Sequence, residues 1–120
     1  MIFSCAGAAH SGQVANRAAV QLTEQGLGQI FCLAAVSAQI EDKLERSRNA
    51  AMRVAIDGCE DHCARRTLEA AGLPVDVHLD LTTLGIEKKP AQPSLIQDAK
   101  KAVIGVEEAI GSDGSRQGCC

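Results

Sequence analysis

The chain has 120 residues, of which 46% are hydrophobic and 22% are charged, a balance typical of one globular domain with a single apolar core. Its net charge is -3, and it contains two Phe with no Trp or Tyr. It therefore lacks the basic patch and the stacking aromatic side chains that nucleic-acid binding normally needs, and we expect no nucleic-acid partner.

Two stretches of the sequence bear on membranes and export. Apolar runs such as "IFCLAAV" are far shorter than the roughly 20 residues needed to cross a bilayer. The start, "MIFSCAGAAH", has no basic region of the kind that opens a signal peptide. We therefore expect a soluble, cytoplasmic protein with no membrane partner. In that reducing compartment, cysteines serve as metal ligands, redox groups or small buried hydrophobes rather than as a disulfide framework.

The first half of the chain alternates apolar runs with helical patterns. "MIFSCAG" predicts a first strand, and residues 11–26 predict a helix that ends at Gly26. "GQIFCLAAV", residues 28–36, predicts a second strand, and residues 37–51 predict a second helix.

The second half continues the alternation. "MRVAIDGC", residues 52–59, predicts a third strand, followed by a third helix from Glu60 to Ala71. "VDVHLDL", residues 75–81, alternates strictly, as a half-exposed edge strand does. Ser94 is the expected N-cap of a last helix that runs to about Ile110.

Strands that alternate with helices form right-handed βαβ units and build a parallel sheet covered by helices. The fold class is therefore α/β: a small doubly wound, mostly parallel four-stranded sheet with helices on both faces, similar to Rossmann and flavodoxin-like folds. We expect one domain over residues 1–110 and a flexible C-terminal tail over residues 111–120.

Four cysteines fall at comparable places in this pattern. Three lie at or near the carboxyl end of an expected strand, and the fourth lies one helical turn further on: Cys5, Cys32, Cys59 and Cys63. Open α/β sheets bind ligands just outside that edge, and neighbouring strands are only about 4.8 Å apart. Residues i and i+4 share a helix face, so Cys59 and Cys63 can face one ion. The pattern predicts one tetrahedral zinc held by four thiolates.

A second interpretation of the same cysteines is thiol chemistry. A helix N-terminus favours thiolate over thiol, which suits a metal ligand and a nucleophile equally. In this alternative Cys59 is the nucleophile and Cys63 the resolving cysteine, although the C-x3-C spacing differs from the C-x2-C of thioredoxin-like sites. The third alternative is that the cysteines are unrelated core residues.

Other polar residues leave alternatives open. Asp57 either orients a metal ligand or caps the third helix. The loop "GAAHSG" either binds an anion on its N–H groups or only makes a tight turn, and we favour the turn. His10 is either a ligand or acid–base group or a solvated loop residue, and we favour the latter. His62 and His78 are expected at the surface.

The segments "IDGCEDHCA", "CAGAAHSGQ" and "IFCLAAV" together resemble the DGC-domain family of small bacterial and archaeal proteins, described as zinc-binding and marked by four cysteines. The resemblance spans about residues 3 to 108, with Asp57 and Gly58 in the motif that names the family. It implies a zinc ion on four residues: Cys5, Cys32, Cys59 and Cys63. Cys119 and Cys120 lie outside the pattern, and we expect them to be inert.

These patterns favour a small metal-binding protein with a structural, sensing or metal-handling role, because a zinc with four protein thiolates has no open position for substrate. The alternative is a thiol redox or sulfur-transfer enzyme. The sequence has no Ser-His-Asp order, paired-carboxylate motif or Walker-type loop, so no catalytic residue is assigned and enzymatic activity is left open. The native metal, a protein partner and the oligomeric state are also left open.

Overall fold

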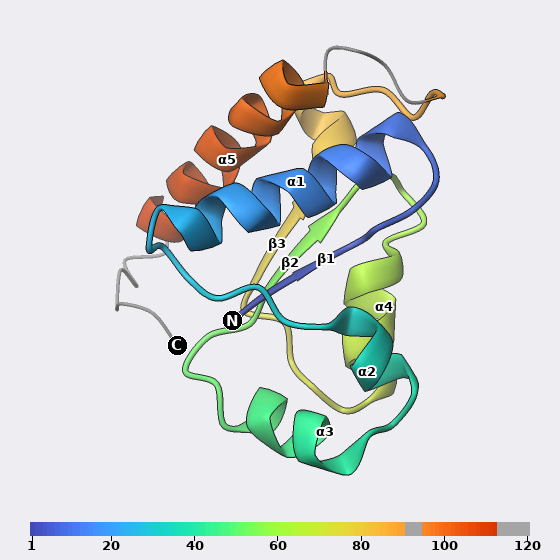
Figure 1. Cartoon of the computed structure of the whole chain (residues 1–120), viewed down its shortest axis with the longest axis vertical. Coiled ribbons are helices and arrows are strands. Elements are labelled where there is room, and N and C mark those ends of the chain that lie inside the picture. Colours follow the sequence, from blue (N-terminus) through green and yellow to red (C-terminus); the bar gives the residue numbers. More distant parts are fainter. Residues whose placement is uncertain (91–94, 113–120) are drawn as a thin grey trace.

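The computed structural model describes residues 1–90 and 95–112, which form an α/β fold around a small parallel sheet (Figure 1). Its strands are β1 (Ile2–Ser4), β2 (Val54–Asp57) and β3 (Val77–Asp80), in the order β1-β2-β3. Both pairings are parallel, so the carboxyl ends of the three strands lie at one edge. The expected α/β class and parallel sheet are confirmed.

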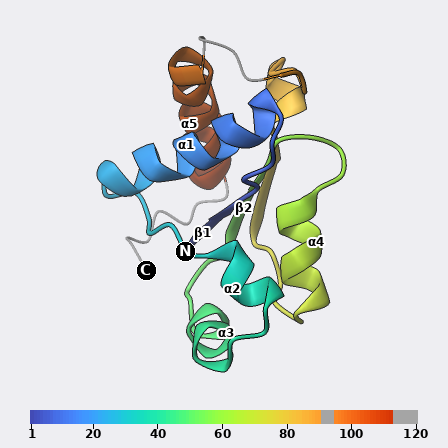
Figure 2. The ribbon, with the colours of Figure 1, turned by 45° about the vertical axis from the view of Figure 1, so that its right-hand side comes forward.

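Helices cover both faces of the sheet (Figures 1 and 2). One face is covered by α1 (His10–Glu24) and α5 (Leu95–Ser112). The other is covered by α2 (Leu33–Ser37) and α4 (Cys63–Ala70), with α3 (Glu41–Arg48) next to α2. A short 3-10 helix, η1 (Leu81–Leu84), follows β3.

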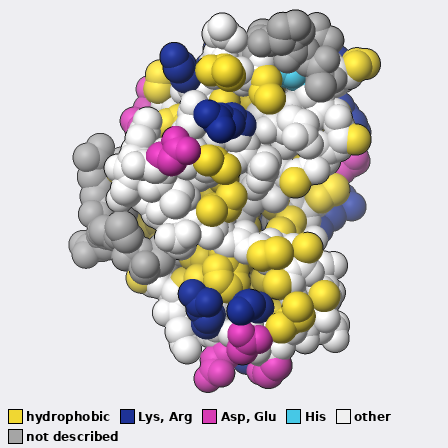
Figure 3. Space-filling model, in the orientation of Figure 1, with side chains coloured by type: hydrophobic (Ala, Val, Ile, Leu, Met, Phe, Trp, Pro, Cys, Tyr) yellow, Lys and Arg dark blue, Asp and Glu magenta, His cyan; other side chains and the backbone are white. Residues whose placement is uncertain are grey.

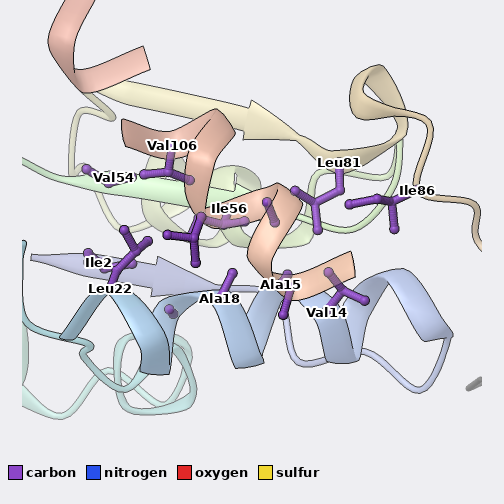
Figure 4. Packing of buried hydrophobic residues seen from close by; sticks show 14 of the residues in the cluster. Ile2, Val14, Ala15, Ala18, Leu22, Val54, Ile56, Leu81, Ile86 and Val106 are labelled. Carbon is purple, nitrogen blue, oxygen red and sulfur yellow. The ribbon is translucent and has the colours of Figure 1, made fainter. Parts of the chain in front are cut away.

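Two apolar clusters hold these layers together. Alternate residues of a strand point to opposite faces, so Ile2 packs toward α1 and α5 while Phe3 packs toward α2 and α4. On the first face, small residues of α1 let α5 approach closely, and Figure 4 shows this packing around Ile56 and Val106. On the second face, Leu68 of α4 joins the cluster of Phe3.

The second expected strand, residues 28–36, is largely replaced by a turn into a helix. Ile30 forms a single parallel bridge with Ile2, and the N–H of Phe31 donates to the Ile2 carbonyl at 2.8 Å. The chain then enters α2 at Leu33, because the alanines of "LAAVS" favour helix over strand. The described sheet therefore has three strands and a bridge rather than the four strands expected.

The third expected helix begins three residues late. Residues 59–62 form a turn in which the N–H of His62 donates to the Cys59 carbonyl at 3.1 Å, and α4 starts only at Cys63. The two cysteines therefore do not share a helix face as i and i+4, which corrects the expectation from spacing. Cys59 precedes the helix and Cys63 is its first residue.

The last helix is described from Leu95 to Ser112, two residues beyond the expected end. Ser94, its expected cap, and residues 113–120, with Cys119 and Cys120, lie outside the described residues. The boundary at residue 110 and the flexible tail remain predictions. No helix within residues 1–90 and 95–112 is both long and apolar enough to cross a membrane. On the face seen in Figure 3, Lys and Arg are mixed with Asp and Glu, without a block of one sign.

A buried cation fixes the amino end of β2. Arg53 is 9% exposed, and its guanidinium donates to carbonyl oxygens at the end of α3 and beyond it, those of Ser47 (2.9 Å), Arg48 (3.3 Å), Ala50 (3.2 Å) and Pro74 (2.6 Å). The backbone N–H of Arg53 donates to the Asp76 carboxylate at 2.7 Å. A positive charge suits this place, because a helix carries partial negative charge at its C-terminus.

Candidate metal and thiol site

Three of the four cysteines lie at the carboxyl edge of the sheet. Cys5 follows β1, and its N–H donates to the Ile56 carbonyl of β2 at 2.9 Å. Cys59 follows β2 after Gly58, and Cys63 opens α4. Cys5 and Cys59 are partly exposed and Cys63 is exposed, so the edge offers thiols to a ligand.

The charges of these groups act on one another. Partial burial of the thiol raises the pKa of Cys63 above its ordinary value of 9.0, and the negative charges of Cys5, Asp57, Asp61 and Cys59 raise it further. Each of these groups is an anion when ionised, so ionising Cys63 is opposed by its neighbours. A cation at this place would relieve that opposition.

The fourth cysteine stands apart from the other three. Cys32 is exposed at the N-cap of α2, and its side chain has no hydrogen bond or ion pair in the part of the chain that the structure describes. Among the described residues, no three His, Cys, Asp or Glu side chains are grouped closely enough to hold a metal ion as they stand. The charges that raise the pKa of Cys63 act over distances longer than the roughly 2.3 Å of a zinc–sulfur bond. They can therefore act on Cys63 although the thiols are not close enough to share an ion.

Asp57, the last residue of β2, holds the start of α4. Its carboxylate accepts the N–H groups of Ala64 at 2.7 Å and Arg65 at 3.1 Å, and its side chain is 1% exposed. A buried anion is favourable here because a helix N-terminus has unpaired N–H groups and partial positive charge. Of the two roles left open for Asp57, the structure shows the capping of the helix.

Gly58 is required by the close approach of α1. A Cβ atom at residue 58 would lie 2.7 Å from the backbone nitrogen of Gly12, a distance that Cβ atoms essentially never adopt. A Cβ at Gly12 would in turn lie 2.7 Å from the Gly7 carbonyl oxygen. The first turn of α1 therefore packs directly against the backbone at Gly58 and Gly7, with no room for side chains between them. This close packing supports the tight-turn interpretation of "GAAHSG".

One histidine–aspartate pair joins β3 to β2, and a second joins the residue before α4 to the end of β3. Nε2 of His78 lies 2.9 Å from Asp57 Oδ2, and Nε2 of His62 lies 2.9 Å from Asp80 Oδ2. The two rings meet edge to face with centroids 4.6 Å apart. The expectation that both histidines are surface residues is wrong, because the partner carboxylates hold them half-buried.

Asp80 is the register partner of Asp57 on the neighbouring strand. Partial burial raises the pKa of its carboxyl group, but hydrogen bonds from Thr82 and His62 outweigh this and hold the pKa below its ordinary value of 3.8. Asp80 is therefore a carboxylate at neutral pH.

Lys88 and Asp61 form an exposed ion pair next to Cys59. Lys88 Nζ lies 3.1 Å from Asp61 Oδ2, and the Cys59 thiol donates to the same oxygen at 3.5 Å. The hydrogen bond from Lys88, supported by that from Cys59, lowers the pKa of Asp61. The hydrogen bond to Asp61 raises the pKa of Lys88, and Cys59 adds to the effect.

His10 lies elsewhere, at the junction of α1 and α5. It is 0% exposed, and its Nε2 lies 2.7 Å from Asp98 Oδ2 at the start of α5. The expectation of a solvated loop histidine is therefore wrong. The partners are 88 residues apart, so no local pattern could reveal the pair.

Sequence reasoning also missed Asp80 and Lys88. A signal for Asp80 existed, because the argument that gathers cysteines at strand ends applies equally to "HLD" at the end of the edge strand. Lys88 follows η1 in an irregular segment, where spacing carries no information about neighbours.

The fold and this edge define a small α/β protein whose parallel sheet presents three thiols and two histidine–aspartate pairs at its carboxyl end. The sequence profile described as the DGC domain matches residues 1–106, and the chain belongs to this family. A protein of Pseudomonas aeruginosa PAO1, named anaerobic and virulence modulator AnvM, is 26% identical over 117 residues, which cover 98% of this chain and 89% of the relative. No solved structure matches the chain.

Proposed function

We propose that the chain is a small metal-binding protein that holds one zinc ion on Cys5, Cys32, Cys59 and Cys63. The observation that carries the proposal is that the segment after β1 and the connection from β2 to α4 bring Cys5, Cys59 and Cys63 to one sheet edge, where the charges of Cys5 and Cys59 act on Cys63. Thiolates are the ligands that zinc favours in structural sites. In open parallel α/β sheets, ligands bind outside the carboxyl ends of the strands.

The thiol chemistry of the donor set suits zinc, but among the described residues no three donors are grouped closely enough to hold an ion, so binding requires the thiols to move together, that of Cys32 included. Cys32 lies between the bridge at Ile30, which pairs with β1, and the start of α2. This segment would have to move so that the Cys32 thiol approaches Cys5. Cys32 is exposed and its side chain has no hydrogen bond or ion pair to break among the described residues. When bound, the ion would tie the ends of β1 and β2 to the start of α4.

Four protein thiolates leave no open position on zinc, so we assign the site a structural, sensing or metal-handling role. The relative named a modulator supports a regulatory role for this chain. Thiolate sites also respond to oxidants and to competing soft metals, which suits a sensor.

The test is elemental analysis of protein purified anaerobically without an affinity metal, combined with thiol titration before and after chelation. We expect about one zinc per chain, which is released at low pH as the thiolates take up protons. Cys32→Ser should lower zinc affinity as much as Cys59→Ser. If Cys32→Ser binds zinc as tightly as the unaltered chain, the four-thiolate site is wrong.

Thiol exchange is the second candidate, and the ion pair at Cys59 favours it. Lys88 and Cys59 share the partner Asp61, which places an ammonium group beside this thiol, whereas the raised pKa of Cys63 keeps that residue a thiol. The Cys59 thiolate would attack a disulfide substrate and release one thiolate. Cys63 would then attack the Cys59 sulfur, forming a Cys59–Cys63 disulfide and releasing the second thiol, so that two electrons pass to the substrate. A reversible Cys59–Cys63 disulfide in metal-free protein, unaffected by Cys32→Ser, would favour this candidate over zinc.

A further inference from the structure

The turn between the two closest cysteines in the sequence contains a left-handed residue. His62 has φ 52° and ψ 47°, a conformation that residues other than glycine rarely adopt. It lies three residues after Cys59 and immediately before Cys63, so its backbone angles contribute to the separation of these two residues. Such a conformation persists only where the surroundings hold it.

The His62 side chain supplies that hold. Its Nε2 is hydrogen-bonded to Asp80 at the end of β3, and its ring packs edge to face on His78, whose Nε2 is bonded to Asp57 at the end of β2. The turn is thereby attached to both strand ends. The side chain of His62 makes no capping hydrogen bond to α4, whose first N–H groups are served by Asp57 instead.

We infer that His62 and Asp80 are positioning residues that fix Cys59 and Cys63 in place before metal binds, a role that rests on the metal site proposed above. Neither residue is a ligand in this role. A ligand pair held in advance loses less conformational freedom on binding, and partners of this kind change metal affinity by about 10- to 100-fold in other sites.

The decisive variant is His62→Gly. Glycine adopts the left-handed conformation readily, so the turn keeps its preferred backbone while losing its attachment to Asp80 and His78. Titrating metal-free protein with cobalt(II), we expect dissociation constants about 10- to 100-fold higher than for the unaltered chain, with weaker thiolate-to-cobalt absorption. His62→Gln, whose terminal amide nitrogen can reach Asp80, should recover part of the affinity. Unchanged cobalt affinity in His62→Gly would overturn the inference.

Two further variants separate positioning from general loss of structure. Thr82→Val removes the other side-chain hydrogen bond to Asp80, that of Thr82 Oγ1 at 2.6 Å, and should leave cobalt affinity within about twofold. Asp80→Ala combined with His62→Gly should weaken binding no more than His62→Gly alone, because both changes break one attachment. Additive losses would show that the two residues act separately and would contradict the inference.

Amide hydrogen exchange in metal-free protein tests the attachment without metal. We expect residues 59–64 to exchange about tenfold faster in His62→Gly than in the unaltered chain, while β2 keeps its protection. If the unaltered chain binds no cobalt but shows this difference, the metal site fails while the turn attachment stands. Equal exchange in the two proteins would overturn the inference whatever the cobalt result.

Discussion

The two ends of β2 are built on the same plan with opposite charges. At the amino end, buried Arg53 donates to carbonyl oxygens where α3 terminates, and at the carboxyl end buried Asp57 accepts N–H groups where α4 begins. Each charge complements the dipole of the helix end that it meets. Both therefore stabilise the contact between a helix and the central strand.

The difference lies in what surrounds each charge. The guanidinium of Arg53 is satisfied largely by backbone carbonyl oxygens, a closed arrangement that leaves little for a ligand. Asp57 lies beside groups that can bind or react: the imidazole of His78 is hydrogen-bonded to it, and its charge acts on the thiol of Cys63. The amino end therefore holds a helix against the central strand, whereas the carboxyl end does the same and also presents the groups of the proposed site.

Replacing Arg53 breaks the amino end and should have the largest effect on folding. Arg53→Met leaves several buried carbonyl oxygens without their donor, and we expect the free energy of unfolding to fall by about 4 kcal/mol. Urea denaturation measures this change. Arg48→Met, which removes only an exposed ion pair with Glu41, is the control and should cost about 0.5 kcal/mol. Equal effects of the two variants would contradict the role given to Arg53.

Gly58→Ala should push the carboxyl end of β2 away from α1. The new methyl group would meet the backbone at Ser11 and Gly12, which cannot yield as a side chain does, and we expect a loss of about 3 kcal/mol. Gly26→Ala is the matched control: its methyl group enters open space, so only the cost of a left-handed backbone, about 1 kcal/mol, applies. Thermal unfolding of the two variants compares them, and a smaller loss for Gly58→Ala than for Gly26→Ala would refute the close-packing argument.

Asp57→Asn retains shape but removes the anion from the carboxyl end. The amide group offers one acceptor where the carboxylate serves Ala64, Arg65 and His78, so we expect unfolding free energy to fall by about 2 kcal/mol. Unlike Arg53→Met, this variant should also weaken zinc binding in its folded fraction, because α4 carries Cys63. Zinc competition with a chromogenic chelator distinguishes the two. Equal zinc affinities in the two folded variants would contradict the claim that only the carboxyl end of β2 supports the metal site.

Asp80→Asn should lower the free energy of unfolding least of these variants, and its effect should depend on pH. The folded-state pKa of Asp80 lies below 3.8, so its contribution to stability is present at neutral pH and is lost as pH falls through the folded-state pKa. For metal-free protein we expect the variant to be about 1 kcal/mol less stable than the unaltered chain above about pH 5, and the difference to shrink on acidification. Urea midpoints measured from pH 7 to 3 check this. A difference that grows toward low pH would contradict the assignment.

The sequence predicts the fold well where periodicity is strong. The helix of residues 11–26 matches α1, and "VAID" and "VHLD" match β2 and β3, because apolar alternation and helical spacing both reflect burial in the core. The expected strand at 28–36 fails because an apolar run rich in alanine suits a short buried helix as well as a strand. Local pattern alone cannot decide between them.

The candidate site shows a similar division. Strand-end reasoning places Cys5 and Cys59 at the correct edge, and the motif "DGC" divides into a helix cap, a close-packed glycine and a thiol. The left-handed angle at His62 and its bond to Asp80 depend on tertiary contacts across 18 residues, which spacing does not encode. The position of Cys32 follows from the failed strand, because the chain turns into α2 directly after it.

X-ray absorption at the zinc edge of the anaerobically purified protein tests the central claim most directly, because it counts the sulfur ligands. We expect four sulfur atoms at about 2.3 Å in the unaltered chain. In Cys32→Ser we expect three sulfur atoms and one lighter ligand. Fewer than four sulfur ligands in the unaltered chain would contradict the four-thiolate site. An absence of bound zinc would also contradict it and would favour thiol exchange at the carboxyl edge of the sheet.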